Sequence, residues 1–311
     1  MDTPAGARAP FSHLTVIGCG LIGGSILMAC RQAYPAMTLR AVDNCPDTLQ
    51  YLLRHDVAHH TSLTPPTTFA PDHLVILSAH LRQSLTLLET IAPSIPESGV
   101  LVSDAGSCKR AICARGAELL GARFIGGHPL AGKEFSGVRR ATPLLFHHKP
   151  WALCPVSPIS EDQEAAEDHK QRLAPLRRLL RDGLGAMIQE VDPERHDRAM
   201  AFVSHFPQLY AVLLANLLNR NQPGQLLGLH GAGLDDQLRL AASPYGLWRD
   251  VFDLNSDNLR DILGLFRQLC DEADPLLTQP AMATWFERAN QAHQAFHQKP
   301  TPARGEPGAG D

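Results

Sequence analysis

The chain has 311 residues, of which 44 % are hydrophobic and 19 % are charged, and its formal net charge is -4 at pH 7. A chain of this size buries one large core or two medium ones, and two domains are the usual division. The small net charge provides no basic surface of the kind that nucleic acid or an anionic membrane requires, so neither partner is expected.

The N-terminus and the cysteines indicate a cytoplasmic protein. Residues 1–10 contain one arginine and no apolar segment, and no run approaches the roughly 18 apolar residues of a membrane span. The seven cysteines form no C-x-x-C pair, which indicates free thiols, and no metal site is predicted. Cys108 is interpreted as a packed small side chain rather than a nucleophile, because no partner is positioned for it.

Short apolar runs alternate with helical segments up to about residue 192. The predicted strands are 13–17, 39–43, 74–78, 100–104, 124–127, 151–155 and 187–191, and the predicted helices are 25–32, 46–54, 81–92, 108–119 and 160–182. Strands that alternate with helices are typical of a parallel sheet with helices on both faces. We therefore expect an α/β, doubly wound, Rossmann-like parallel sheet over residues 13–192, after a flexible N-terminus at 1–12.

The pattern changes after Pro193. Helical periodicity runs through 194–218, 245–255, 256–273 and 282–297 without a strand signal between them. An all-helical domain is therefore predicted over residues 193–297. The tail, 298–311, is rich in proline, glycine and charge, so it is expected to be disordered.

The first predicted strand runs directly into a glycine-rich turn. Residues 18–23 read G-C-G-L-I-G, which is the G-x-G-x-x-G spacing between a strand and a helix. Gly18 allows the tight turn, Gly20 lets the backbone approach a pyrophosphate, and Gly23 permits close packing of helix on strand. Leu21 and Ile22 complete the turn at the helix N-terminus, whose free N–H groups suit a phosphate. The turn predicts a dinucleotide site.

A carboxylate farther along the chain selects the dinucleotide. Asp43 ends the second predicted strand, where it can accept hydrogen bonds from ribose hydroxyls and would repel a 2'-phosphate. Ser78, at the end of the third predicted strand, is included among the cofactor-binding residues. NAD is therefore predicted in preference to NADP. A turn that merely joined strand and helix would leave the position of Asp43 to coincidence.

Two further segments follow predicted strands, where open α/β sheets bind their ligands. Residues 103–109 read S-D-A-G-S-C-K, which places the hydroxyl of Ser107 and the ammonium of Lys109 at the tip of a strand. Residues 126–137 read G-G-H-P-L-A-G-K-E-F-S-G and hold His128 on a stiff turn. A lone histidine is more often structural, but His128 is predicted to face the crevice.

These segments resemble the motifs of the prephenate and arogenate dehydrogenases of tyrosine biosynthesis. That family is marked by G-x-G-L-I-G-G-S, D-x-x-S-x-K and G-G-H-P-x-A-G-x-E-x-S-G, and all three are present. The resemblance continues through H-D-R-A at 196–199, S-H-F-P at 204–207 and the segments 233–243 and 248–250, and it spans about 13–297. Several motifs together are more specific than a glycine turn alone.

The resemblance implies NAD-dependent oxidative decarboxylation of prephenate, a cyclohexadiene dicarboxylate, to 4-hydroxyphenylpyruvate. Hydride leaves C4 and carbon dioxide leaves C1. Loss of hydride builds positive charge at C4, so a base that accepts the hydroxyl proton lowers the barrier. His128 matches that base, which predicts that activity falls at acidic pH with an apparent pKa of about 6 to 7.

By the same resemblance, other residues hold the substrate. Ser107 would hydrogen-bond the substrate hydroxyl or orient His128. Lys109 would shape the loop near the nicotinamide, and a surface charge at a helix start is the alternative. Arg239 is the candidate for gripping a carboxylate with its bidentate guanidinium, and Asp236, one helical turn earlier, would aim it.

Two more positions complete the implied site. Glu134 would gate the cleft, as its counterpart does in the family. His205 would line the pocket from the helical domain, or else pack between helices. Arg249 and Arg198 are rival carboxylate grips, for which ordinary salt bridges are the preferred interpretation.

Two positions depart from the family pattern. Many prephenate-using members read S-H-x-P-H, where this chain has Gln208, and F-R-D-x-T-R, where residues 234–239 read L-D-D-Q-L-R. Asp235 thus replaces a cation close to the implied substrate grip. This reversal of charge suggests an amine-bearing substrate, arogenate or an amino-substituted prephenate, as the alternative to prephenate.

The helical domain of the family forms a homodimer, which is therefore expected here. Because few residues follow the predicted helices, neither a fused chorismate mutase nor a C-terminal regulatory domain is expected. A dehydrogenase of the β-hydroxyacid or imine-reducing kind is one alternative, and the G-G-H-P-x-A-G segment argues against it. A non-catalytic, NAD-sensing dimeric protein is another, and it would not need His128, Ser107 and Arg239 together.

Overall fold

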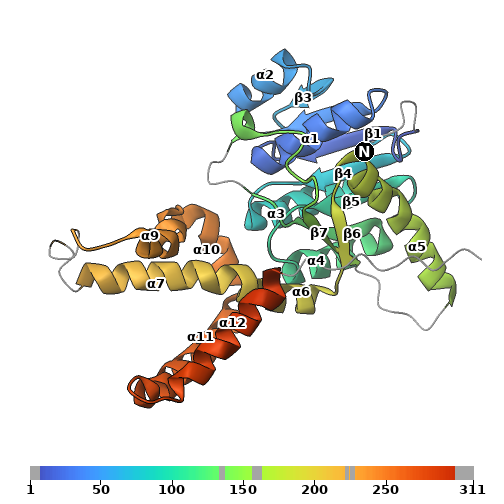
Figure 1. Cartoon of the computed structure of the whole chain (residues 1–311). Helices are drawn as coiled ribbons and strands as arrows, with labels where there is room; N and C mark the ends of the chain where they lie inside the picture. The colour runs from blue at the N-terminus through green and yellow to red at the C-terminus, as the bar shows by residue number, and fades with distance from the viewer. Residues whose placement is uncertain (1–7, 133–136, 156–162, 221–223, 225–227, 298–311) are drawn as a thin grey trace, which may run out of the picture. The chain divides into compact units, whose positions relative to one another are not determined.

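The computed structural model describes residues 8–132, 137–155, 163–220, 224 and 228–297. The chain divides into two compact units, one up to Leu259 and one from Arg260 onward, which are described separately. The first unit contains the sheet and the helices that follow it (Figure 1). Residues 1–7 and the predicted disordered tail, 298–311, lie outside the described residues.

The described part of the first unit contains an eight-stranded sheet in the order β3-β2-β1-β4-β5-β6-β7-β8. The strands are β1 (His13–Ile17), β2 (Thr38–Val42), β3 (His60–Ser62), β4 (His73–Leu77), β5 (Val100–Asp104), β6 (Phe124–Pro129), β7 (Pro150–Pro155) and β8 (Met187–Glu190). β1 to β6 are parallel and follow the strand order of a dinucleotide-binding fold. The predicted Rossmann-like class is confirmed, although the short strand β3 was not predicted.

The sheet is mixed rather than wholly parallel. β7 pairs antiparallel with β6, and β8 pairs parallel with β7, so the prediction of an all-parallel sheet is wrong for the last two strands. A parallel crossover needs a connection of a dozen or more residues, usually a helix. Between β6 and β7 the described chain contains only a short 3-10 segment, Val138–Arg140, and this connection returns the chain in the opposite direction.

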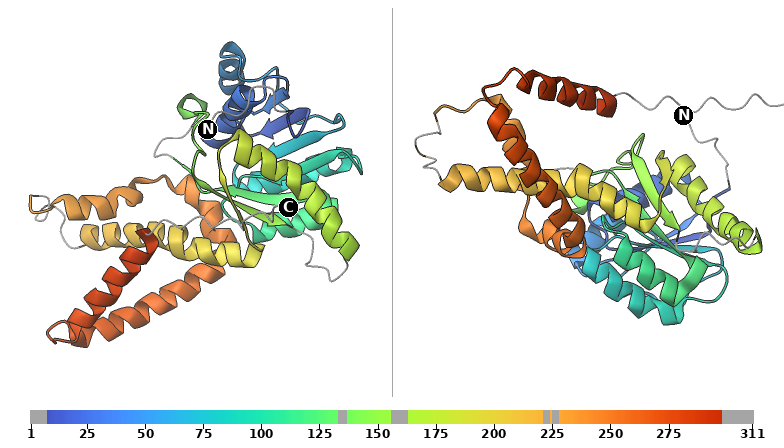
Figure 2. Two further views of the ribbon diagram at one scale, coloured as in Figure 1. Left: turned by 45° about the vertical axis from the view of Figure 1, so that its right-hand side comes forward. Right: turned by 90° about the horizontal axis from the view of Figure 1, so that it is seen from below.

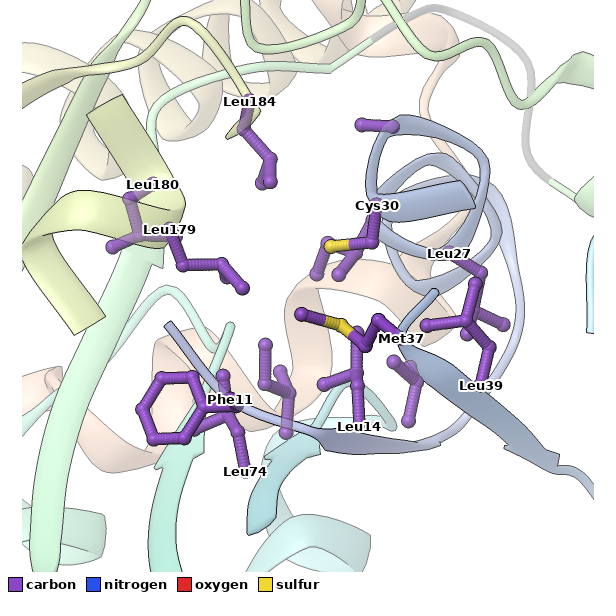
Figure 3. Close-up of a cluster of buried hydrophobic side chains, with 14 of the residues drawn as sticks. Phe11, Leu14, Leu27, Cys30, Met37, Leu39, Leu74, Leu179, Leu180 and Leu184 are labelled. Atoms are coloured by element: carbon purple, nitrogen blue, oxygen red, sulfur yellow. The ribbon is translucent and has the colours of Figure 1, made fainter. Parts of the chain in front are cut away.

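Helices cover both faces of the sheet. One face packs against α1 (Leu21–Ala33), α2 (Pro46–Arg54) and α5 (Gln163–Arg178), and the other against α3 (Leu81–Ile91) and α4 (Arg110–Leu120). Side chains of a strand alternate between its faces, and β4 feeds both cores in this way. Figure 3 shows Leu39 of β2 beside Leu27 of α1, and Leu14, Leu74 and Leu179 belong to the same buried cluster. Burial on both faces explains why these strands read as continuous apolar runs.

A long helix follows the sheet. It consists of α6 (Pro193–Met200), a π-helical segment (Ala201–His205) and α7 (Phe206–Arg220). Its start is capped by the side chain of Asp192, which accepts the Arg195 N–H at 2.8 Å. α9 (Ala232–Leu238) and a 3-10 segment (Arg239–Ala242) lie along α7, and α10 (Tyr245–Leu254) follows (Figures 1 and 2).

This long helix has the length and composition of a membrane span. An 18-residue window within Pro193–Arg220 has a mean hydropathy of 1.4, and only 22 % of that window is buried. The sequence expectation counted consecutive apolar residues; in this helix scattered polar residues interrupt the apolar run, but the mean hydropathy of the window stays high. Phe202 and Leu217 are 48 % and 60 % exposed. Exposed apolar faces of this kind are typical of surfaces that contact another molecule.

The second unit is helical. It contains the remainder of α11 (Ser256–Ala273), a 3-10 segment (Asp274–Leu276) and α12 (Met282–His297). α11 and α12 match the predicted ranges 256–273 and 282–297.

Candidate active site

The glycine turn lies between the end of β1 at Ile17 and the start of α1 at Leu21. Gly18 has a φ of 91°, in the left-handed region that favours glycine. A Cβ at Gly23 would lie 2.0 Å from the Gly18 carbonyl oxygen, so only glycine lets α1 pack this closely on the strand. At Gly20, by contrast, no atom of the described residues lies within 4 Å of the Cβ position. The turn is therefore tight on the protein side and open where a pyrophosphate would approach.

A cavity of about 470 Å³ lies over this turn. Its lining includes six of the predicted cofactor residues, namely Gly18, Gly20, Leu21, Ile22, Asp43 and Ser78. The N–H of Ser78 donates to the Ile17 carbonyl at 2.7 Å, which joins the ends of β4 and β1. This is the point where the strand order reverses, and ligands bind there in open α/β sheets.

Two backbone groups hold the Asp43 carboxylate at the edge of this cavity. Its Oδ2 accepts the Cys19 N–H at 2.7 Å, and its Oδ1 accepts the Cys45 N–H at 2.9 Å. A carboxylate has about four lone-pair sites, so it can still accept bonds from two ribose hydroxyls. The open approach at Gly20, the free N–H groups of α1 and this fixed carboxylate fit the adenosine half of a dinucleotide.

Substitutions at two glycines should separate folding from cofactor binding. Gly20→Ala should leave the thermal midpoint of the cofactor-free chain within a few degrees and weaken NAD binding by at least about tenfold, because the new methyl group occupies the pyrophosphate approach. Gly23→Ala should lower the thermal midpoint itself, because its Cβ meets the Gly18 carbonyl oxygen. Calorimetric titration with NAD and thermal unfolding measure the two effects. Unchanged NAD affinity in Gly20→Ala would contradict the placement of the pyrophosphate.

A second cavity, of about 250 Å³, adjoins the first. The two share Ile22, Ser78 and His80 in their linings, so they form one continuous cleft. Ser107 and His128 line the second cavity. The structure therefore brings together the two residues that the sequence assigned to catalysis, directly beside the predicted dinucleotide.

His128 is the second-last residue of β6 rather than a residue beyond the strand, and it is half-buried. Its Nδ1 is 2.9 Å from Nε2 of His196, and the rings meet edge to face. Burial, together with His196 and Lys109, lowers the pKa of His128 well below its ordinary value of 6.5. Because His196 occupies Nδ1 of His128, Ser107 does not orient His128 through that nitrogen. The contact proposed for Ser107 is therefore with the substrate.

The lowered pKa of His128 moves the expected pH dependence of activity to lower pH. A base must be neutral to accept a proton, so kcat/KM should fall as the pH drops through the pKa of His128 in the free enzyme. Because burial and the charge of Lys109 lower that pKa, the fall should be centred below pH 6.5, at a lower pH than the sequence alone suggests. The measurement is kcat/KM from pH 4.5 to 8. A midpoint above 6.5 would contradict either the burial of His128 or its role.

Lys109 is fully buried, so the interpretation of a surface charge is wrong. Its Nζ donates to Oδ2 of Asp104 and, at 2.8 Å, to the Gly127 carbonyl oxygen. Burial would lower the pKa of Lys109, but the charge and hydrogen bond of Asp104 raise it above its ordinary value. Lys109 does not line either cavity, and it ties β5 to β6 next to His128.

Other predicted substrate residues lie elsewhere. Arg239 and Asp236 are exposed, and neither lines either cavity. His205 is buried, with Nδ1 at 3.0 Å from Nδ2 of Asn255, so it packs between helices. Burial lowers the pKa of His205 to about 4. Glu134 lies outside the described residues, and Arg249 pairs with Asp250 at 3.0 Å as its simpler interpretation required.

Sequence reasoning missed three charged or polar residues around His128, namely Asp104, His196 and Asp197. His196 and Asp197 stand in the H-D-R-A motif of the resemblance, which carried no role at that stage. Asp104 begins the D-x-x-S-x-K motif. The motifs were a signal that these residues matter, but only the fold shows that His196 contacts both His128 and Asp197, and that Asp104 contacts Lys109.

A six-stranded parallel core, a dinucleotide cavity at its switch point and a histidine in the adjoining cavity define a dinucleotide-dependent dehydrogenase. Family models for the nucleotide-binding domain and the dimerization domain of prephenate dehydrogenase match residues 62–183 and 192–291. The chain belongs to the prephenate dehydrogenase family of oxidoreductases. The first match begins after the glycine turn, so the case for that turn depends on its own geometry.

Similar proteins carry related names. A prephenate dehydrogenase of Bacillus subtilis is 30 % identical over 80 % of this chain, which spans 65 % of that protein's length. A prephenate dehydrogenase of Lactococcus lactis is 28 % identical over 91 % of this chain and 77 % of its own. The crystal structure of prephenate dehydrogenase from A. aeolicus, in complex with hydroxyphenyl propionate and NAD+, is 25 % identical with a TM-score of 0.79, covering 92 % of this chain and 97 % of that one.

Proposed function

We propose that this chain catalyses the NAD-dependent oxidative decarboxylation of prephenate to 4-hydroxyphenylpyruvate in the cytoplasm. One observation carries the proposal, namely that His128 and Ser107 line a cavity that is continuous with the predicted dinucleotide cavity. The names of the Bacillus and Lactococcus relatives support the substrate. The complex of the A. aeolicus enzyme with NAD+ and a hydroxyphenyl acid supports the cofactor and the ring.

The reaction requires the protein to transfer one proton and to place the substrate accurately beside NAD. Bound NAD supplies the acceptor for hydride. His128 accepts the proton of the C4 hydroxyl while the C4–H bond breaks with its electron pair, and the oxygen lone pair forms a C4=O double bond. The bond from C1 to its carboxylate then breaks, carbon dioxide leaves, and its electrons make the ring aromatic. The oxygen regains the proton from His128, so no proton is gained or lost overall.

A direct assay tests this function. The full chain is mixed with NAD and, in separate cuvettes, prephenate, arogenate and amino-substituted prephenate, and the absorbance of reduced cofactor is followed. Turnover of prephenate is expected. Absence of turnover with all three substrates would exclude the enzymatic function and favour the non-catalytic, NAD-sensing dimer. A strong preference for an amine-bearing substrate would favour the alternative raised by Asp235, which is exposed and lines neither cavity.

We also propose that the chain is a homodimer. The match to a dimerization domain over 192–291 and the exposed apolar side chains of the long helix support this. Sedimentation equilibrium should give twice the 33.9 kDa of one chain. Leu217→Asp should dissociate the dimer, because it places a charge on the exposed face, whereas Leu53→Asp on α2 should not. A monomeric parent chain would overturn the proposal.

Arg239 remains the proposed grip for a substrate carboxylate. Arg239→Lys should raise the KM for prephenate by about tenfold or more with little change in kcat, because a lysine cannot reproduce the bidentate fork. Since Arg239 does not line the cavity within one chain, the measurement is made on the dimer, with its mass checked in parallel. An unchanged KM would assign the grip to another residue.

A further inference from the structure

A continuous series of hydrogen bonds leads from His128 into the buried interior. Nδ1 of His128 is 2.9 Å from Nε2 of His196, and Nδ1 of His196 is 2.8 Å from Oδ1 of Asp197. His196 and Asp197 belong to α6, whereas His128 belongs to β6. The side chains of His196 and Asp197 are each 1 % exposed. The series therefore joins the cavity to a buried carboxylate on a different element.

The carboxylate of Asp197 is held in its charged form. Its Oδ1 accepts the Lys109 N–H at 2.7 Å and its Oδ2 accepts the Arg110 N–H at 3.0 Å, both at the start of α4. Burial would raise the pKa of Asp197, but the hydrogen bonds from His196 and from these N–H groups lower it overall. The N-terminus of a helix also favours negative charge.

An ionised Asp197 determines where the protons of both rings lie. A carboxylate only accepts hydrogen bonds, so Nδ1 of His196 must carry a proton. A neutral His196 then has its lone pair on Nε2, and that nitrogen can only accept. Nδ1 of His128 must therefore donate, which leaves the lone pair of His128 on Nε2. Among the described residues this Nε2 has no hydrogen-bond partner, and His128 lines the cavity.

We propose that His196 and Asp197 are positioning residues that hold the proton of His128 on Nδ1 and so leave Nε2 free to accept the proton of the substrate. The inference deepens the proposed function and rests on His128 as its base. These two residues select one ring orientation and one tautomer of His128, which His128 alone would not select. When His128 takes up the proton, the bond to His196 and the charge of Asp197 stabilise the imidazolium.

The surrounding charges agree with this arrangement. The ammonium of Lys109 lowers the pKa of His128, and it is itself paired with the carboxylate of Asp104. Arg110 pairs with Asp257, at 2.6 Å from its Nη1, and its Nε also lies 3.4 Å from Oδ2 of Asp197, which favours the ionised form of that carboxylate. Asp197 is thus the carboxylate that hydrogen bonds connect to His128, through His196. The backbone carbonyl of Asp197 also accepts a hydrogen bond from Nδ2 of Asn255 at 2.8 Å, which anchors α6 at this residue.

Kinetics separate positioning from simple packing. His196→Leu removes the acceptor for Nδ1 of His128 and should lower kcat by about 10²- to 10⁴-fold, while the KM and the NAD affinity change by less than about threefold, because His196 lines neither cavity. His196→Gln places an amide oxygen where Nε2 was and should recover part of the loss. His73→Gln is the matched control, since His73 is another buried histidine, bonded to Thr15 at 2.9 Å.

The decisive measurement reads the tautomer itself and needs no turnover. The full chain, labelled with ¹⁵N-histidine and saturated with NAD, is examined by long-range ¹H–¹⁵N correlation, and the signals of His128 among the 15 histidines are identified by their loss in His128→Asn. A protonated Nδ1 and an unprotonated Nε2 are expected, and His196→Leu should redistribute the proton toward Nε2.

Each outcome bears on one proposal. A parent chain with the His128 proton on Nε2 would overturn the positioning role, as would a tautomer unaffected by His196→Leu. If that variant fails to fold, the parent spectrum alone decides. A chain that shows the expected tautomer but turns over none of the three substrates would remove the proposed reaction and leave the placement of the proton intact.

Discussion

Replacing His128 with asparagine should lower kcat for prephenate by about 10²- to 10⁴-fold, the usual contribution of a general base. His128 lines the cavity that adjoins the dinucleotide cavity, and asparagine has no basic nitrogen to accept the hydroxyl proton. NAD affinity should stay within about twofold, because His128 does not line the larger cavity. The formation of reduced cofactor and a calorimetric titration with NAD provide the two measurements.

A matched substitution shows whether this loss is specific. His55→Asn changes an exposed histidine at the end of α2, which lines neither cavity, and should leave kcat unchanged. Thermal unfolding of His128→Asn should remain close to that of the parent chain. An active His128→Asn variant would exclude this residue as the base and would also remove the reason for the ordered bonds behind it. Thermal unfolding is measured beside kcat because a variant that loses activity only by unfolding would say nothing about the mechanism.

The parts of the site that could be predicted from sequence are those that lie on one continuous segment. The glycine turn and Asp43 follow their strands directly, so the strand pattern alone places them at one edge of the sheet. Ser107 and His128 follow β5 and end β6, and adjacent parallel strands bring them to the same edge. Periodicity and strand ends therefore suffice for these residues.

Other features depend on how distant segments pack. His196 contacts His128 across 68 positions of sequence, and a local motif does not specify such a contact. The burial of Lys109 could not be inferred either, because a lysine at a helix start is normally solvated, and only the fold shows Asp104 beside it. The reversal of β7 depends on a connection whose direction the alternation of strands and helices does not determine. Arg239 was assigned by resemblance alone, and one chain does not bring it to the cavity.

The buried pair of Lys109 and Asp104 should give the largest change in stability. Asp104→Asn should lower the free energy of unfolding by about 3–5 kcal/mol, the usual cost of leaving one charge of a buried pair without its partner. Lys109→Met should cost less, because Asp104 keeps the N–H groups of Gly106 at 2.8 Å and Gly127 at 3.0 Å. Urea unfolding of the cofactor-free chain measures both. The two costs differ because different partners remain: among the described residues, the Lys109 ammonium would keep only the Gly127 carbonyl as a partner besides the new asparagine.

The double variant decides whether the pair itself is responsible. Asp104→Asn combined with Lys109→Met leaves no charge to bury, so its free energy of unfolding should exceed that of Asp104→Asn alone. Arg115→Met is the control, because Arg115 pairs with Glu89 at 2.9 Å on the surface and its loss should have little effect. Additive costs in the double variant would mean that the two charges do not stabilise each other. Lys109 and Asp104 both form hydrogen bonds with the backbone of Gly127, the residue before His128. The pair therefore helps to hold His128 in place, and a loss of stability here should be accompanied by a lower kcat.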